Sequence, residues 1–353
     1  MGEAAEVLVE TVGALGRIRL NRPKAINALT LDMIRRIVLA LEQFEADAGI
    51  GLVLITGEGE RGLCAGGDIR ALYDHGRDKS NPGEVFFREE YRMNAQIATY
   101  KKPYIAVMDG ITMGGGVGVS AHGALRIVTE RTRMAMPETG IGFFPDVGGT
   151  WLLSHAPGEI GTFMGLTGES FGGADAIYAN FADMLVQSGK IPALIEALAA
   201  LPASTTVAQA RATVATFTDQ ATSPLAAHRA LIDHCFAFDT IEEIFAALTA
   251  SGDEFARKTL DTLHHKSPTS LKVTLRLLRL ARQDQRMQDS LEREFAATHT
   301  VLASDNFYEG VRAAVVDKDR NPKWLPATVK EVSDAMVTQY LRPSATKLFE
   351  SKL

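Results

Sequence analysis

Short apolar segments alternate with segments of helical spacing through the first half of the chain. Apolar runs cover residues 52–56 and 103–110, and a glycine-rich stretch followed by a helix-like segment comes after each of them. Parallel strands must be joined by a crossover, which is usually a helix, so this alternation favours a largely parallel sheet. The chain is therefore predicted to have an α/β fold.

The N-terminal residues are predicted to form a hairpin and then a helix that faces the core. Two β-prone runs, 7–12 and 17–20, flank a turn region with Gly13 and Gly16. Residues 30–48 carry apolar side chains at helical spacing, namely Met33, Ile34, Ile37, Leu41 and Phe44.

The second half is predicted to be mostly helical. Beyond residue 168 the sequence contains Ala-rich runs such as 191–200 and 241–250, with few strand signals. Residues 203–225 have little periodicity, which makes them the candidate boundary. We expect an α/β core over 1–202 and a helical C-terminal region over 203–353.

Composition restricts the partners of the chain. Its 353 residues are 46% hydrophobic, and 37 Lys and Arg against 43 Asp and Glu give a net charge of −6. Such a chain is a globular protein without a broad basic surface, so we expect neither nucleic acid nor a membrane as a partner. Cys64 and Cys235 are far apart and lack the clustered spacing of a zinc site or a disulfide framework. No motif in the sequence requires a metal or an organic cofactor, so neither is predicted.

The two ends of the chain give conflicting signals about location. The N-terminal residues MGEAAEVLVE are acidic and match neither a secretory nor a mitochondrial signal. The last three residues, Ser351, Lys352 and Leu353, match the peroxisomal address, which is read only in organisms that have its receptor. We predict a bacterial cytoplasmic protein, or a peroxisomal matrix protein if the source is a eukaryote.

Two glycine-rich turns are the first candidates for chemistry. Residues 64–68 (CAGGD) and 113–118 (MGGGVG) each follow an apolar strand and precede a predicted helix. The free N–H groups at a helix start favour negative charge, so two such turns together could hold a carbonyl oxygen in an oxyanion hole. The alternative is that each is only a tight turn that lets a helix pack closely on a strand.

Other catalytic patterns do not fit. Neither turn has the Gly-Lys-Ser/Thr ending of a P-loop or the spacing of a dinucleotide fingerprint. Ser120 and Ser154 lie outside any Gly-x-Ser-x-Gly elbow. His264 and His265 are adjacent and are expected to lie on a solvated helix face, and we expect His122 to be structural.

Two carboxylates are more informative. Glu138 and Asp146 lie in apolar segments that Pro and Gly interrupt, MPETG and FFPDVGG. Desolvation in such a setting raises the pKa of a carboxyl group and improves it as a base. On the residues alone, the two could share a cavity, or each could cap a neighbouring helix.

The order of motifs resembles the crotonase (enoyl-CoA hydratase/isomerase) superfamily. The matching segments are NRPKAINAL (21–29), CAGGDIR (64–70), KPYIAVMDGITMGGGVGVS (102–120) and MPETGIGFFPDVGG (136–149). Within the superfamily the chain is most similar to the 3-hydroxyisobutyryl-CoA hydrolases, through VFFREEY (85–91), LTG (166–168) and DNFYEGVRA (305–313) followed by DKD (317–319). The resemblance therefore covers most of the chain.

The resemblance implies a spiral of ββα turns that binds acyl-CoA. The oxyanion hole would consist of the backbone N–H groups of Gly67 and Gly115. The CoA moiety would pass residues Lys24, Ala25, Ile26, Ala65 and Gly66. The helical C-terminal region of relatives commonly mediates association, so a homo-oligomer is a further expectation.

The resemblance also points to a reaction. Hydratases resemble GGGxE at the second turn, but this chain has Gly118 at the position of that glutamate. The hydrolase pattern instead supplies Glu138, Asp146 and Glu90, which with Gly115 would bind the substrate, Glu138 and Asp146 being catalytic. The implied activity is hydrolysis of a short 3-hydroxyacyl-CoA, most simply 3-hydroxyisobutyryl-CoA in valine breakdown. The alternatives are hydration or isomerisation of an enoyl-CoA and non-catalytic binding of acyl-CoA.

Overall fold

The structure is a computed structural model that describes residues 5–76 and 82–349, in two compact units. Unit 1 consists of the chain up to Gly67, Met93–Ala135 and Phe171–Pro224. Unit 2 consists of Asp68–Arg92, Met136–Ser170 and the chain from Leu225 onward. These bounds differ from the consecutive segments 1–202 and 203–353, because two segments of the N-terminal half pack with the C-terminal helices. The predicted domain boundary after residue 202 remains a prediction.

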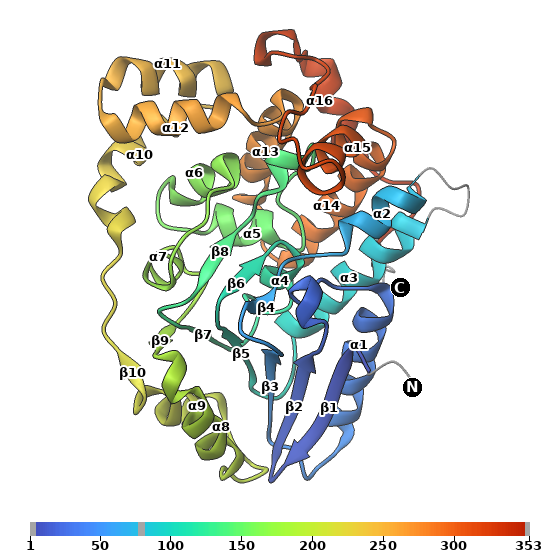
Figure 1. The fold of residues 1–353 in the computed structure, drawn as a ribbon, viewed down its shortest axis with the longest axis vertical. Helices are drawn as coiled ribbons and strands as arrows, with labels where there is room; N and C mark the ends of the chain where they lie inside the picture. The colour runs from blue at the N-terminus through green and yellow to red at the C-terminus, as the bar shows by residue number, and fades with distance from the viewer. Residues whose placement is uncertain (1–4, 77–81, 350–353) are drawn as a thin grey trace. The chain divides into compact units, whose positions relative to one another are not determined.

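Unit 1 contains two sheets (Figure 1). The larger has the strand order β1-β2-β3-β5-β7-β9-β10, with the bounds Val7–Val12, Leu15–Leu20, Leu52–Gly57, Tyr104–Met108, Leu125–Val128, Met184–Val186 and Thr218–Asp219. Its edge strands β1 and β10 pair antiparallel, and the strands between them are parallel. The smaller sheet is parallel and contains β4 (Gly62–Cys64), β6 (Ile111–Met113) and β8 (Arg133–Ala135).

The chain passes repeatedly from the larger sheet to the smaller one. β3 and β4, β5 and β6, and β7 and β8 are consecutive pairs with one strand in each sheet. The next element is α2 (Ile69–His75), α4 (Gly115–Gly118) or the 3-10 turn η2 (Glu138–Ile141). The predicted spiral of ββα turns is confirmed.

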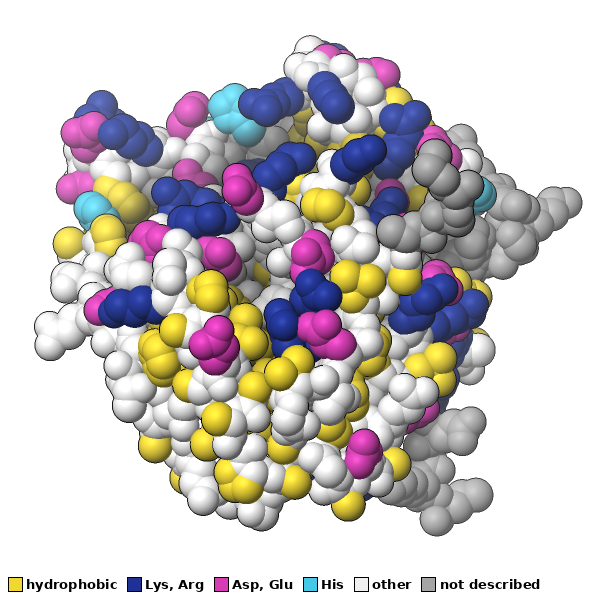
Figure 2. All heavy atoms as spheres, turned by 60° about the horizontal axis from the view of Figure 1, so that its bottom comes forward, with side chains coloured by type: hydrophobic (Ala, Val, Ile, Leu, Met, Phe, Trp, Pro, Cys, Tyr) yellow, Lys and Arg dark blue, Asp and Glu magenta, His cyan; other side chains and the backbone are white. Residues whose placement is uncertain are grey.

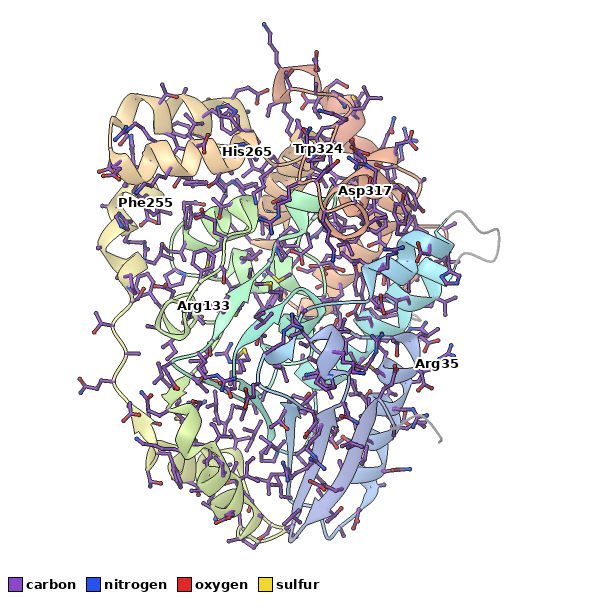
Figure 3. The ribbon with its side chains drawn as sticks, in the orientation of Figure 1. Arg35, Arg133, Phe255, His265, Asp317 and Trp324 are labelled. Carbon is purple, nitrogen blue, oxygen red and sulfur yellow. The ribbon has the colours of Figure 1, made fainter. Side chains whose placement is uncertain are left out.

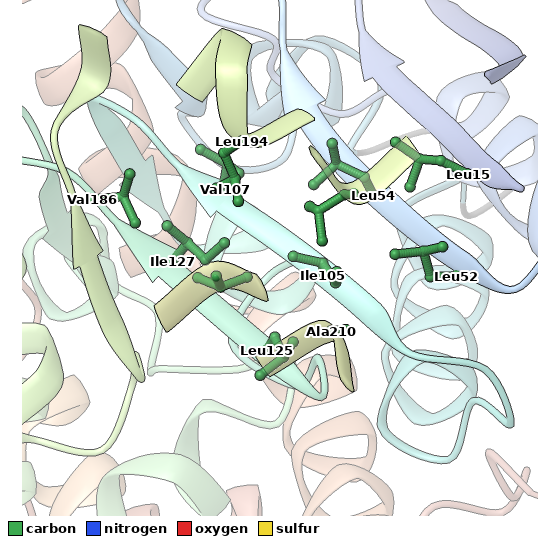
Figure 4. Packing of buried hydrophobic residues seen from close by; sticks show 12 residues of the cluster. Leu15, Leu52, Leu54, Ile105, Val107, Leu125, Ile127, Val186, Leu194 and Ala210 are labelled. Atoms are coloured by element: carbon green, nitrogen blue, oxygen red, sulfur yellow. The ribbon is translucent and has the colours of Figure 1, made fainter. Parts of the chain in front are cut away.

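The core of unit 1 lies between the large sheet and two helices, α8 (Ile191–Ala199) and α9 (Val207–Ala215) (Figure 4). Side chains alternate between the two faces of a strand, so every second residue of the central strands reaches this core. The strand residues in it are Leu15, Leu52, Leu54, Ile105, Val107, Leu125, Ile127 and Val186.

The predicted N-terminal hairpin and helix are confirmed. β1 pairs with β2 across a turn in which Gly13 has a φ of +60°. Helix α1 spans Leu31–Ala46, and the hydroxyl of its cap residue Thr30 accepts the Met33 N–H at 3.2 Å. The apolar stripe read from the sequence is the buried face of this helix.

Unit 2 is predominantly helical. Helix α13 contacts α5, α6, α14 and α16, and Leu271, Leu275 and Leu278 form part of its buried stripe. The helices that lie wholly in this unit after η2 are α5 (Gly149–Ser154), α6 (Ile160–Thr167), α10 (Arg229–Cys235), α11 (Ile241–Ser251), α12 (Glu254–His264), α13 (Pro268–Ala281), α14 (Met287–Leu302), α15 (Asp305–Val311) and α16 (Asp334–Tyr340). The helical character predicted for the second half is therefore confirmed.

Charges of both signs are mixed on the surface. On the face that Figure 2 draws, Lys and Arg side chains lie among Asp and Glu side chains. Of the helices in the described ranges, none combines the length and the apolar character needed to cross a membrane.

Candidate active site

The two glycine-rich turns lie side by side in unit 1. A Cβ atom added to Gly116 would lie 2.3 Å from the carbonyl oxygen of Cys64. A Cβ atom on Gly66, whose φ is +113°, would lie 3.8 Å from the Gly115 nitrogen. The turns therefore meet through their main chains, and position 116 leaves no space for a side chain.

The predicted donors Gly67 and Gly115 lie at helix starts. Gly115 is the first residue of α4, after Gly114 with a φ of +48°, and the first N–H groups of a helix have no acceptor within it. Gly67 precedes Asp68, which caps α2 by accepting the Ala71 N–H at 3.2 Å. These positions suit two main-chain donors, and their role as an oxyanion hole stays a proposal.

The segment predicted to contact CoA adjoins the first glycine turn within unit 1. Lys24 and Ala25 are exposed residues of a 3-10 turn, and Ile26 follows with a φ of +49°. The Ala65 N–H donates to the Ile26 carbonyl oxygen at 2.9 Å. The structure thus joins the two stretches that the sequence assigned to one ligand.

Asn27 holds this segment in place, which the sequence reading did not anticipate. Its side-chain oxygen accepts the Arg22 N–H at 2.9 Å, and its amide donates to the carbonyl oxygens of Glu58 and Gly62 at 3.1 Å each. The buried Asn27 side chain therefore anchors residues 22–27 to the segment 58–62, which leads into β4.

The three predicted carboxylates all belong to unit 2 and are all buried. Glu90 is 2% exposed and lies on α3 (Pro82–Ala98), Glu138 is 6% exposed at the start of η2, and Asp146 is 5% exposed before α5. The charge of Asp146 acts on the ionisation of both glutamates, so the structure brings the three groups together.

The hydrogen bonds of these carboxylates differ. The Tyr91 hydroxyl donates to Asp146 Oδ2 at 2.7 Å and contacts Thr298 Oγ1 at 3.1 Å. In contrast, Glu90 Oε1 and Glu138 Oε2 are buried and have no hydrogen-bond partner among the described residues. A buried polar atom without a partner is costly, so these two oxygens are available to a ligand.

A fourth carboxylate, Glu294 on α14, completes the cluster and was missed in the sequence. It is fully buried, and it accepts the backbone N–H groups of Gly148 at 2.8 Å and Thr150 at 3.0 Å as well as the Thr150 hydroxyl. Glu294 occupies the apolar stripe of its helix, between Leu291 and Thr298. The charged neighbours Glu292 and Arg293 conceal this buried position in the sequence.

Glu294 also settles whether Asp146 is a helix cap. The cap residue of α5 is Gly148, Glu294 accepts the N–H groups of Gly148 and Thr150, and the Gly149 N–H donates to the main-chain carbonyl oxygen of Asp146. The cap residue of η2 is Pro137, and Glu138 Oε2 has no hydrogen-bond partner among the described residues. Neither predicted carboxylate therefore occupies the N-cap position of the element that follows it.

Aromatic rings make the surroundings of the carboxylates apolar. Phe143 stacks on Phe87 and on Phe144, with ring centroids 5.4 and 4.7 Å apart, and it also contacts Phe307 at 5.7 Å. Tyr91 packs against Phe87 at 5.9 Å. These rings desolvate the ionisable groups beside them.

Burial raises the pKa of Asp146 and Glu294. The pKa of Asp146 rises to about 7, although the hydrogen bonds from Tyr91 and from its own backbone oppose the effect of burial. The pKa of Glu294 rises to about 8, because burial outweighs the hydrogen bonds from Thr150 and Gly148.

The other two carboxyl groups hold their protons more tightly. Burial, followed by the charge of Asp146, raises the pKa of Glu90 and that of Glu138 well above the ordinary range. Asp146 is therefore the group in this cluster that ionises first near neutral pH.

The serine, histidine and cysteine residues that received no catalytic role in the sequence analysis make ordinary structural contacts. The Ser120 hydroxyl donates to the Gly116 carbonyl oxygen at 2.6 Å within the second glycine turn. His265 is exposed beside Trp324, whose indole N–H contacts its carbonyl oxygen at 3.4 Å (Figure 3). Cys64 and Cys235 are buried, and neither forms a disulfide within the described residues. Within residues 5–76 and 82–349, no group of His, Cys, Asp and Glu side chains is arranged to hold a metal ion.

Comparison with known proteins identifies close relatives. The family model for enoyl-CoA hydratase/isomerase matches residues 15–341. The chain is 43% identical to a mitochondrial 3-hydroxyisobutyryl-CoA hydrolase of Gallus gallus and 42% identical to that of Homo sapiens, over 96% of this chain and 89% of each relative.

Solved structures match equally well but carry other activity names. A carnitinyl-CoA dehydratase from Mycobacterium thermoresistibile has a TM-score of 0.93 and 44% identity, over 99% of this chain and all of the other. An enoyl-CoA hydratase from Rhodobacter sphaeroides has a TM-score of 0.88 and 40% identity, over 96% of this chain and 98% of the other.

One sequence prediction is wrong. The hydrolases to which the chain is similar are named as mitochondrial proteins, which points to mitochondria rather than to the cytoplasm or the peroxisomal matrix. An N-terminal composition without a recognisable signal was a poor guide to location. The tripeptide Ser351, Lys352 and Leu353 lies outside the described residues.

The fold, the paired glycine turns and the motif order agree with these relatives. The family model covers most of the chain, and identities above 40% extend over nearly its full length. The chain belongs to the enoyl-CoA hydratase/isomerase (crotonase) family.

Proposed function

We propose that this chain hydrolyses the thioester of 3-hydroxyisobutyryl-CoA to 3-hydroxyisobutyrate and free CoA. The observation that carries the proposal is the buried carboxylate cluster, in which Glu90 and Glu138 each have an oxygen without a partner among the described residues. The names of the relatives with 42–44% identity support the same substrate. The product acid would enter valine breakdown.

The two main-chain donors serve the acyl oxygen. Attack on the thioester carbon converts the carbonyl oxygen into an oxyanion, which the Gly67 and Gly115 N–H groups stabilise. Loss of one such donor typically lowers the rate about 10²–10³-fold. Lys24, Ala25, Ile26, Ala65 and Gly66 bind the CoA portion, which enters only as part of the substrate.

The carboxylates supply the nucleophile and handle its proton. In one route the ionised form of Glu138 takes a proton from water as the water oxygen attacks the thioester carbon. In the other route an oxygen of ionised Glu138 attacks the thioester carbon directly, and water then hydrolyses the acyl anhydride. In both, the C–S bond breaks and CoA leaves as a thiolate, which is a better leaving group than an alkoxide.

Asp146 and Glu90 have supporting roles. Asp146, the first of the cluster to ionise, orients the water or the substrate hydroxyl, and in the anhydride route it accepts the proton of the water that hydrolyses the anhydride. Glu90 offers its unpartnered oxygen to the hydroxyl of the 3-hydroxyacyl group. A single turnover in ¹⁸O-labelled water tests for the anhydride route, because label can enter the Glu138 carboxylate only if an anhydride forms and water attacks its Glu138 carbonyl carbon.

The second candidate is hydration or isomerisation of an enoyl-CoA. Two solved relatives at 40% and 44% identity carry a hydratase and a dehydratase name. Against this candidate, residue 118 is a buried glycine on α4 rather than a glutamate. Asp146 would then have to replace the missing carboxylate.

The deciding experiment uses two substrates. The purified protein is incubated separately with 3-hydroxyisobutyryl-CoA and with crotonyl-CoA, and both free thiol and enoyl absorbance are followed. Rapid thiol release from the first substrate supports hydrolysis. Loss of enoyl absorbance from the second without thiol release would replace the proposal by the hydratase candidate, and binding without any turnover would favour a non-catalytic acyl-CoA-binding protein.

A further inference from the structure

The turn that carries Asp146 has a strained backbone. Val147 has a φ of +56° and Gly148 a φ of +77°. A β-branched residue is a true outlier in the left-handed region, and the surrounding structure must offset the cost of that conformation. The conformation of the residue next to Asp146 is therefore imposed by other parts of unit 2.

Glu294 is the group that fixes the far side of this turn. Its Oε2 accepts the Gly148 N–H at 2.8 Å, and its Oε1 accepts the Thr150 N–H at 3.0 Å and the Thr150 hydroxyl. Both carboxylate oxygens of Glu294 are therefore occupied by hydrogen bonds. Their donors lie at least 144 positions away in the sequence, and the bonds form where α14 contacts α5.

A simple structural cap would not require so costly a group. Glu294 is fully buried, and both burial and the nearby charge of Asp146 oppose its ionisation. The helix that it caps, α5, has only six residues. The energetic cost of burying Glu294 is therefore better explained by its hydrogen bonds to the 146–150 turn than by its contribution to capping α5.

Helix α14 also reaches the other side of the turn. Thr298, one helical turn after Glu294, contacts the hydroxyl of Tyr91, which donates to the Asp146 carboxylate. One helix therefore holds the turn that follows Asp146 through Glu294 and supports the Asp146 side chain through Thr298 and Tyr91.

We propose that Glu294 is a positioning residue for Asp146: it holds the strained 146–150 turn so that the Asp146 carboxylate is fixed for the hydrolysis proposed above. The inference rests on that proposed function. It assigns Glu294 no contact with substrate, only control over the placement of Asp146.

The test compares Glu294→Gln with Glu292→Gln. Glutamine has the same size, but its NH₂ group cannot accept a backbone N–H, so one side of the turn is released. Glu292 is the matched control, because it lies on the same helix and also accepts backbone N–H groups, those of Leu348 and Phe349. For Glu294→Gln we expect kcat for thiol release to fall about 10- to 100-fold with KM changed less than about twofold. Glu292→Gln should keep the wild-type kcat.

A milder variant keeps the test decisive if Glu294→Gln does not fold. Thr150→Val removes only the hydroxyl donor to Glu294 and should lower kcat several-fold at constant KM. Its effect should be smaller in the Glu294→Gln background, since both changes act on one contact. Amide hydrogen exchange at Gly148 and Thr150 should accelerate in Glu294→Gln and stay unchanged in Glu292→Gln.

The outcomes separate this inference from the proposed function. Folded Glu294→Gln or, failing that, Thr150→Val with wild-type kcat would overturn the positioning role. If wild-type protein releases no thiol from 3-hydroxyisobutyryl-CoA, the proposed function fails instead. The same variants are then assayed in the acyl-CoA reaction that the wild type does catalyse, and an unchanged kcat there would overturn the inference too.

Discussion

The hydroxyl of Tyr91 donates a hydrogen bond to Asp146 Oδ2 over 2.7 Å, and both side chains are buried in unit 2. Burial alone raises the pKa of Asp146, and this hydrogen bond opposes the rise, leaving a pKa of about 7. The pair therefore sets the pH at which the first carboxylate of the cluster becomes available as a proton acceptor.

Replacing Tyr91 by Phe should shift the pH dependence of the reaction. Without the donor the pKa of Asp146 rises further, so a higher pH is needed to ionise it. We expect the acid limb of the kcat/KM profile to move to higher pH and kcat at pH 7 to fall about tenfold. Thiol release measured from pH 5.5 to 9 gives the profile.

Tyr100→Phe is the control for this experiment. The Tyr100 hydroxyl donates to the Leu41 carbonyl oxygen at 2.6 Å, and both residues belong to unit 1. The Tyr100→Phe variant loses a tyrosine hydrogen bond of similar length, and the Tyr91–Asp146 hydrogen bond is kept. An acid limb that moves equally in both variants, or in neither, would contradict the role assigned to Tyr91.

The raised pKa of Asp146 also predicts how stability depends on pH. Between the unfolded pKa near 3.8 and the folded pKa of about 7, the folded state keeps a proton that the unfolded chain releases. The free energy of unfolding therefore falls as pH rises through this window, by at most about 1.4 kcal/mol per pH unit for one group. Above the folded pKa the loss is complete.

Asp146→Asn isolates this contribution. Asparagine still presents an oxygen to Tyr91 but does not titrate, so the variant should lose less stability than the wild type between pH 5 and pH 7. Urea unfolding at these two values gives the difference. Parallel losses in the two proteins would show that Asp146 ionises normally in the folded state.

Gly116→Ala should disrupt the paired glycine turns. The added Cβ would lie 2.3 Å from the Cys64 carbonyl oxygen, so the two main chains must separate. We expect thiol release to fall at least about 100-fold, as for loss of an oxyanion donor, together with a lower melting temperature. Gly172→Ala, where nothing lies within 4 Å of the added atom, should leave both unchanged.

Much of the fold could be predicted because local patterns match the final packing. Alternate residues of 52–56 and 103–110 face the α8 and α9 core, and the apolar stripe of 30–48 is the buried face of α1. The two compact units could not be predicted. They depend on the pairing of residues 68–92 and 136–170 with helices beyond residue 225, and hydrophobic periodicity contains no information on which distant segments pack together.

The site was predictable only where the motif itself carries the chemistry. Glu138, Asp146 and the glycine turns lie within short, distinctive segments. Glu294 lies in LEREFAATH, where charged neighbours make the helix resemble a solvated one, and its partners are 144–146 positions away. Tyr91 was read as part of a motif without a role, because its hydrogen bond to Asp146 is a long-range contact.

The central claim is that Glu138 drives cleavage of an acyl-CoA thioester. The most direct measurement is the single-turnover rate of thiol release from 3-hydroxyisobutyryl-CoA by the wild type and by Glu138→Gln, with substrate binding measured in parallel. We predict that the variant binds the substrate with similar affinity and releases thiol roughly 10²–10⁴-fold more slowly. A folded Glu138→Gln variant that releases thiol at the wild-type rate would contradict the account.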